Sequence, residues 1–414
     1  MRQFLQSRSL GGPQFLAAGL LLIYLLECMW LVRIESQHGP RVNSDRDSRI
    51  YYGLQQWTSG AVAGTPDSLL SAAPTWVPPQ DTGKHIRARD GFDQDRSPLY
   101  YLIAAAPMLI RPASWNPSLP FWHLLAAAPY LFFGVMLGGS LWYVARRLYG
   151  NAGGFIALGL YCFSPAMIVN VAGPHHFGEI GGAWGVFGVI WTAIAVAHTL
   201  YAPREVVLWN WRRILLLGLS IALAVGHQFS LAILVLVVLL LMLWVAPIRK
   251  AAVLVIWGAA CLVGALLLFA AYFFHFGLFW QGMLHARWID FDPRSLTVAV
   301  SYRFVADQLL HGSPALAATL AVAVVAFAVW KRVRYFGNIA PLAVAVLLLV
   351  LGTAAPAFPG EGFSLAWLIF LFVFVAGVFA DLIETRRGPM VAAALTGLLV
   401  ASAFWNILQL AVAR

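Results

Sequence analysis

The chain consists mainly of long apolar runs separated by short polar connections. Runs of about 20 apolar residues recur along it, and each is long enough for a helix to cross a hydrocarbon core. Lipid offers the backbone no hydrogen-bond partners, so we predict that these runs are helical. Eleven spans are predicted, at residues 14–33, 120–145, 152–173, 179–200, 213–226, 229–246, 250–274, 314–331, 338–357, 364–384 and 389–411.

Composition agrees with this interpretation. Hydrophobic residues make up 61% of the chain and charged residues 11%, which excludes an ordinary soluble domain. The run at 14–33 is too long for a secretory signal and lacks its small-residue cleavage pattern, so we interpret it as a span. We therefore expect an all-α polytopic membrane protein in which residues 1–414 form a single integral membrane domain, without a separate soluble domain.

The orientation of the chain depends on the segment Pro98–Ile110, which is short for a span. If this segment lies flat at the membrane surface, fourteen basic and three acidic residues fall on the cytoplasmic side. If it crosses, Arg146, Arg147, Arg212 and other arginines move outside, against the positive-inside rule. We therefore predict an internal amino terminus, and two large external loops at 34–119 and 275–313 that carry interfacial helices. The net charge of +10 follows from this topology, and it indicates no nucleic-acid partner.

The first external loop holds most of the candidate chemistry. The apolar spacing of residues 41–60 predicts a short amphipathic helix that ends at Ser59–Gly60, whereas residues 61–82 are rich in Ala, Pro, Ser and Gly and are expected to be irregular. Eight acidic and eight basic residues balance each other across 34–119. Such a balance is typical of ion-paired structure or of a site for a charged ligand.

Two motifs in this loop have a recognisable order and spacing. The first is Asp47-Ser-Arg-Ile-Tyr51, and the second is Arg96-Ser97-Pro98-Leu99-Tyr100-Tyr101. Together with Phe163-Ser164-Pro165 farther along, they resemble GT-C glycosyltransferases, in the branch of protein O-mannosyltransferases and lipid A aminoarabinose transferases. The resemblance covers roughly residues 14–245. It implies a GT-C-like helical bundle that moves a sugar from a polyprenyl-phosphate donor to an acceptor at the extracytoplasmic face, here of a bacterial inner membrane.

The resemblance also implies roles for individual residues. Asp47 would be the catalytic base, because a partly desolvated carboxylate can take the proton of an acceptor hydroxyl. Arg96 would contact the donor phosphate, since a guanidinium pairs with phosphate oxygens in a bidentate manner. Glu179, fourteen residues after Pro165, would be a supporting catalytic acid. Further candidates for substrate binding are Asp45, Tyr51, Tyr100, His175 and His176.

No resident cofactor is indicated, and a divalent metal remains open. His175, His176, Glu179 and His227 could converge with the second external loop, but no pair has the spacing of a helical metal site, and we expect ordinary hydrogen bonds instead. His227 and Glu27 interrupt apolar runs, where a polar residue needs water or a partner, and we interpret both as lining a cavity under the loops.

Two departures from the family pattern leave the function open. Ser48 stands where the family usually has Glu, and Ser97 replaces the first proline of its Pro-Pro-Leu-Tyr-Tyr stretch. One alternative is therefore a catalytically inactive GT-C-fold subunit or assembly factor of a larger membrane complex. A transporter is a weaker alternative, because charge inside the spans is nearly absent and no broken helix repeats between halves. The expected partners are membrane lipid, the lipid-linked sugar and other membrane subunits.

Overall fold

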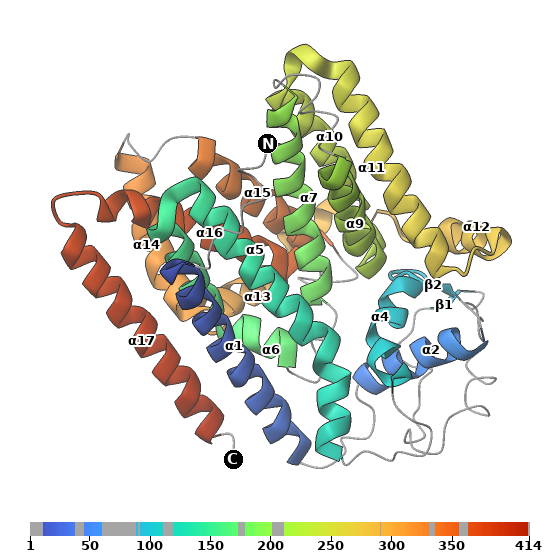
Figure 1. The fold of residues 1–414 in the computed structure, drawn as a ribbon, viewed down its shortest axis with the longest axis horizontal. Helices are drawn as coiled ribbons and strands as arrows, with labels where there is room; N and C mark the ends of the chain where they lie inside the picture. Colours follow the sequence, from blue (N-terminus) through green and yellow to red (C-terminus); the bar gives the residue numbers. More distant parts are fainter. Residues whose placement is uncertain are drawn as a thin grey trace.

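The computed structural model describes residues 11–37, 45–59, 88–89, 92–110, 119–172, 179–200, 211–289, 291–330, 336–355 and 363–412. Within these ranges the chain is helical, as predicted, apart from one antiparallel pair of two-residue strands, β1 (Ala88–Arg89) and β2 (Phe92–Asp93). The long helices form a bundle, and a smaller group of short helices lies at one end of it (Figure 1).

The described parts of the eleven predicted spans are mainly helical, but the predicted span 152–173 is broken at residues 163–164. They correspond to α1 (Gly12–Gln37), α5 (Leu119–Cys162), α6 (Pro165–Ala172), α7 (Glu179–Thr199), α9 (Trp211–His227), α10 (Ile233–Val245), α11 (Lys250–Ala271), α14 (Pro314–Val329), α15 (Phe336–Thr353), α16 (Phe363–Ile383) and α17 (Gly388–Val412). The range of α5 holds two helices joined at Gly150, whose φ of 73° suits glycine.

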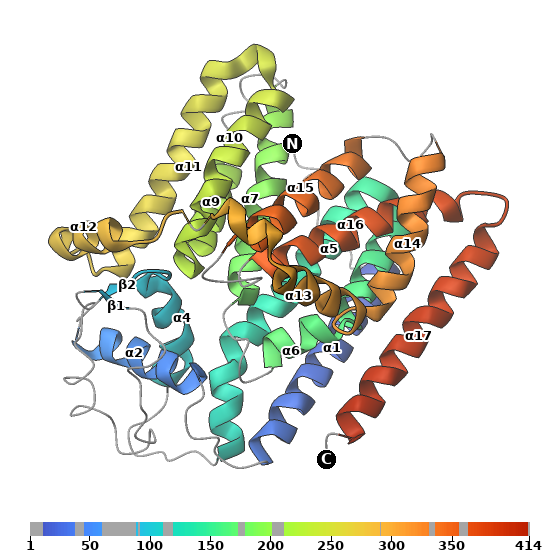
Figure 2. The ribbon, with the colours of Figure 1, turned by 180° about the vertical axis from the view of Figure 1, so that it is seen from behind.

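Length and apolar composition qualify six of the described helices as membrane spans. The number rises to seven if α13 (Ala299–Leu310) and α14, which meet at a bend of 99°, count as one broken span. Figure 2 shows this bent pair from behind. The protein is therefore an integral membrane protein, while the number of eleven crossings and their direction remain predictions.

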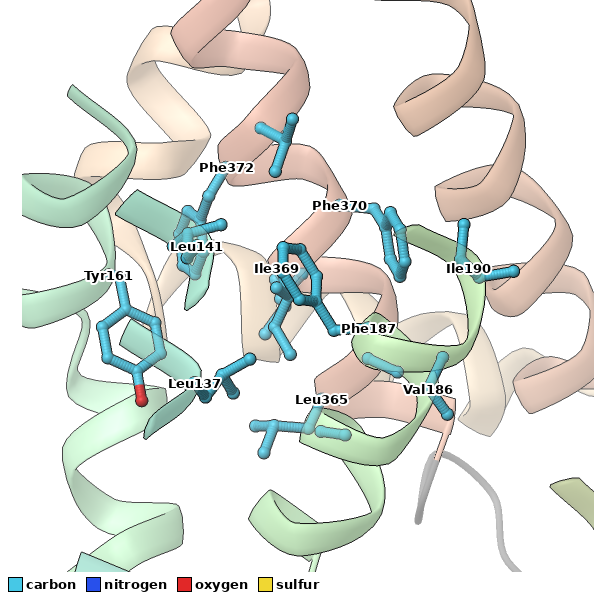
Figure 3. Packing of buried hydrophobic residues seen from close by; sticks show 14 of the residues in the cluster. Leu137, Leu141, Tyr161, Val186, Phe187, Ile190, Leu365, Ile369, Phe370 and Phe372 are labelled. Atoms are coloured by element: carbon cyan, nitrogen blue, oxygen red, sulfur yellow. The ribbon is translucent and has the colours of Figure 1, made fainter. Parts of the chain in front are cut away.

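The centre of the bundle is α16. It is apolar on all sides and is buried along nearly its whole length, as expected for a helix that is surrounded by others. Its aromatic side chains interlock with α5 and α7 (Figure 3), and the ring centroids of Phe187 and Phe370 lie 5.6 Å apart. This core fixes the positions of the helix ends from which the external elements start.

Helices α7 and α9 approach closely because glycines line their crossing. An added Cβ at Gly185 would lie 2.5 Å from the backbone nitrogen of Ala224, and one at Gly188 would meet the Ser220 hydroxyl. Small residues of this kind let membrane helices pack backbone to backbone. The crossing brings the end of α9 at His227 beside the start of α7 at Glu179.

Two short helices of the predicted first external loop pack against each other. They are α2 (Asp45–Ser59), which matches the predicted amphipathic helix, and α4 (Pro98–Leu109), which matches the predicted interfacial segment (Figure 1). The indole N–H of Trp57 donates to the carbonyl oxygen of Leu102 at 3.0 Å. The second loop contains α12 (Phe276–His285) and the 3-10 helix η5 (Pro293–Thr297), followed by α13.

Candidate functional site

The segment that carries Arg96 is fixed to the bundle by backbone hydrogen bonds. Both the amide and the hydroxyl of Ser97 donate to the carbonyl oxygen of Gly226, at 3.0 and 2.9 Å. The amide of Phe229 donates to the carbonyl oxygen of Asp95 at 2.9 Å. A proline at position 97 would lose both bonds to Gly226, because it has neither an N–H nor a hydroxyl. Ser97 therefore has a structural role in docking the loop.

Tyr100 lies at the centre of the site, in the first turn of α4. Its ring is buried, and the guanidinium carbons of Arg96 and Arg49 lie 4.7 and 5.4 Å from the ring centroid. These distances are typical of cation–π contacts. The ring of His227 meets the same tyrosine edge-on, with the centroids 5.5 Å apart. One aromatic ring thus gathers side chains from α2, α9 and the start of α4.

Charges of both signs act on Tyr100. Burial raises the pKa of its hydroxyl, the positive charges of Arg49 and Arg96 lower it, and the negative charges of Glu179 and Asp93 raise it. The neighbouring Tyr101 hydroxyl donates to Asp93 Oδ2, and Asp93 Oδ1 accepts from the amide of Asp95 at 2.9 Å. The site therefore combines two arginines and two carboxylates around a buried tyrosine.

The two predicted external loops meet beside this cluster. Arg287, which follows α12, places its Nη1 atom 3.6 Å from Oδ1 of the buried Asp95. Its backbone amide also donates to the carbonyl oxygen of Gln94 at 2.7 Å. The second loop thus supports the two residues that precede Arg96. Because the ion pair between Arg287 and Asp95 is partly buried, salt screens it less than an exposed pair.

His227 connects the loop to the membrane helices. Its Nδ1 atom lies 2.8 Å from the carbonyl oxygen of Leu223, so this nitrogen carries the hydrogen and Nε2 is the acceptor of the neutral ring. Nε2 is buried and makes no hydrogen bond to the described residues. It lies against Gly181, which has no side chain that could bind it. The sequence indicates a polar residue that needs a partner here, and the structure shows contacts with Tyr100 and Phe133.

The structure places some of the predicted site residues together. Arg96, Tyr100 and Glu179 belong to one cluster. Asp45, Asp47 and Tyr51 belong to α2, but their side chains lie outside the described part of the chain. His175 and His176 also lie outside the described residues, and Glu27 is buried in α1.

Arg49 and Asp93 belong to the cluster but were not predicted. Arg49 could have been noticed because it belongs to the predicted amphipathic helix and is the neighbour of the buried Ile50. For Asp93 the sequence offered no indication beyond its position in the charged stretch 84–96.

In the described ranges no group of three His, Cys, Asp or Glu side chains is arranged to hold a metal ion. Cys28 and Cys162 are buried in the apolar core, and Cys261 is half-buried. The chemistry available to the described cluster is therefore that of guanidinium, carboxylate, phenol and imidazole groups.

Comparison with known proteins gives a distant structural likeness. No protein-family model matches the chain, and none of the curated proteins matches it. Among solved structures, the chain is similar to the crystal structure of the Archaeoglobus fulgidus oligosaccharyltransferase in complex with zinc and sulfate, at 14% sequence identity and a TM-score of 0.48. The match covers 76% of this chain and 44% of that one, so this chain spans less than half of that protein's length. At this TM-score the likeness carries no argument about activity.

Proposed function

We propose that this protein is a GT-C-type glycosyltransferase that moves a sugar from a polyprenyl phosphate to an acceptor at the extracytoplasmic membrane face. The observation that carries the proposal is the pair of guanidinium groups, from Arg49 and Arg96, that lie over the ring of Tyr100. The hydrogen bonds of Ser97 to Gly226 hold Tyr100 in place at the start of α4. Guanidinium groups suit phosphate recognition because their N–H donors match the phosphate oxygens. Arg96 is the residue that the family resemblance assigns to this role.

The proposed reaction is a single displacement. The acceptor oxygen attacks the anomeric carbon, the bond from that carbon to the phosphate oxygen breaks, and its electron pair leaves with the polyprenyl phosphate. Attack from the side opposite the leaving group inverts the sugar carbon. The proton of the acceptor hydroxyl passes to Asp47, and the charge that develops on the phosphate is stabilised by Arg96.

Glu179 supports this reaction as an acid or as a group that orients the acceptor. Its charge acts on Tyr100, which places it near the arginine pair. Asp45, Tyr51, His175 and His176 are proposed to complete the substrate site, and the donor tail to lie in an apolar groove between spans. A divalent metal would need ligands outside the described residues.

A second candidate function is that of a catalytically inactive GT-C-fold subunit of a membrane complex. The observation that favours it is the role of Ser97, which replaces the family's proline and serves to dock the loop on Gly226. The negative charges of Asp93 and Glu179 also act on Tyr100 against the two arginines, an arrangement that suits a structural ion cluster.

Substitution of Arg96 separates these functions. In nanodiscs, Arg96→Lys should raise the donor concentration required for half-maximal transfer, because lysine keeps the charge and loses the planar pair of donors. Arg96→Ala should raise it further. Arg303→Ala, in the exposed part of α13, is the matched control and should behave as the wild type. Equal donor affinities in all four proteins would remove Arg96 from the donor site, and wild-type protein without transfer from any polyprenyl-phosphate sugar would favour the inactive subunit.

A further inference from the structure

Helix α12 has three distinct faces. At 100° per residue, Phe276, Trp280 and Leu284 occupy an arc of 80°, and their side chains are 68%, 55% and 66% exposed. The next arc is polar and contains Gln281 and His285. The remaining side of the helix faces the protein and is formed by Leu278, Phe279, Gly282 and Met283.

The protein-facing side holds α12 in one orientation. An added Cβ at Gly282 would lie 2.8 Å from Cε1 of Tyr272, so the helix rests directly on that buried ring. The ring of Phe279 meets Tyr272 edge-on, with the centroids 5.4 Å apart. Because these contacts fix the rotation of α12 about its axis, the exposed apolar arc and the polar arc point in defined directions.

The connection to α11 gives α12 its place relative to the membrane. The outer side of α11 exposes Leu262 and Leu266, as expected for a span that faces lipid. Four residues join the two helices, and two of them, Phe273 and Phe274, have φ values of 51° and 60°, a region that aromatic residues rarely adopt. The sharp turn directs α12 away from the end of α11 (Figure 1).

We propose that α12 is a lipid-binding helix at the extracytoplasmic surface of the membrane, with the arc of Phe276, Trp280 and Leu284 inserted among the lipids. The candidate span of α11 ends at Ala271, so only four residues separate α12 from the span, and the polar arc of Gln281 and His285 borders the apolar arc. An exposed apolar arc beside a polar arc suits a helix that lies at the boundary between lipid and water. Tryptophan is also enriched at that boundary.

This surface goes beyond the proposed transfer reaction and does not depend on it. It does affect the same region, because Arg287 follows α12 and binds both Asp95 and the backbone of Gln94. The depth of α12 in the lipid would therefore set the height of the segment that leads to Arg96.

Nitroxide labelling tests this arrangement. Cys28 and Cys162 are buried and Cys261 is half-buried, so a Cys261→Ala background limits labelling to an introduced cysteine. Trp280→Cys and Leu284→Cys report the apolar arc, and the neighbouring Gln281→Cys is the matched control. In nanodiscs of a phosphatidylcholine and phosphatidylglycerol mixture, collisions with oxygen, which partitions into lipid, and with a water-soluble nickel chelate are measured.

Labels at 280 and 284 should collide several-fold more with oxygen than with the nickel chelate, and the label at 281 should show the reverse order. Nickel access at 280 and 284 equal to that at 281 would overturn the proposal, because the apolar arc would then face water. Protection of 280 and 284 from both reagents would also overturn it, since a protein partner would then cover the arc. If Trp280→Cys is poorly folded, Leu284→Cys gives the same reading.

Discussion

Gly53→Ala tests the packing that positions Arg49. Gly53 lies where α2 crosses α4, and an added Cβ would overlap the carbonyl oxygen of Tyr101 and lie 2.6 Å from Cβ of Ala105. The carbonyl belongs to the backbone of α4 and cannot rotate away, so the two helices must separate. Overpacking of this kind costs about 1–3 kcal/mol. Because Arg49 belongs to α2, a displacement of about 1 Å could also reduce a transfer rate by about 10²-fold.

Hydrogen exchange measured by mass spectrometry gives the assay. A loss of about 1–3 kcal/mol in local stability corresponds to exchange about 5- to 150-fold faster in α2 and α4, with α16 unchanged. Gly258→Ala is the control, because a Cβ at this position of α11 would meet no atom within 4 Å. Alanine there should be neutral or should stabilise the helix by about 0.4–1 kcal/mol. If the amides of α2 and α4 exchange equally fast in Gly53→Ala and Gly258→Ala, the two helices do not cross as closely at Gly53 as described.

Two further predictions concern the catalytic base and the topology. Asp47→Asn keeps the shape of the side chain and removes its basicity, so transfer turnover should fall by about 10²-fold or more, whereas Asp45→Asn should have a smaller effect; full turnover in both variants would exclude Asp47 as the base. Cysteines introduced at 34–119 and 275–313 should react with an impermeant thiol reagent added outside, and cysteines at 146–150 and 331–336 should not. Reaction at 146–150 would show that 98–110 crosses the membrane.

The positions of the helices were predictable because each depends mainly on local sequence, whereas six of the described helices, or seven with the bent pair of α13 and α14, qualify as membrane spans. The run 364–384 was predicted from its apolar residues, and it forms α16 at Phe363–Ile383. The same holds for the short helices, since the spacing of 41–60 and the length of 98–110 gave α2 and α4 without knowledge of their neighbours. The spacing of apolar residues along a helix reflects its surroundings, because contact with lipid or with the core on one side requires apolar residues on that side.

The site was only partly predictable because its contacts join distant parts of the chain. Arg96 and Tyr100 were found through a motif, but the bond from Ser97 to Gly226 spans 129 positions and the contact of Arg287 with Gln94 spans 193. No local pattern indicates which carbonyl a serine will meet. His227 was recognised as a polar residue in an apolar run, whereas its contact with Tyr100 required the crossing of α7 and α9.

In the proposed function, the arginine pair on Tyr100 binds the phosphate of a lipid-linked sugar. Electron cryo-microscopy of the protein in nanodiscs that contain a polyprenyl-phosphate sugar tests this most directly. We expect phosphate density within hydrogen-bonding distance of Arg96, about 3 Å from its guanidinium nitrogens, and the lipid tail between spans. An ordered donor bound elsewhere, or an arginine pair without phosphate at saturating donor, would contradict the claim.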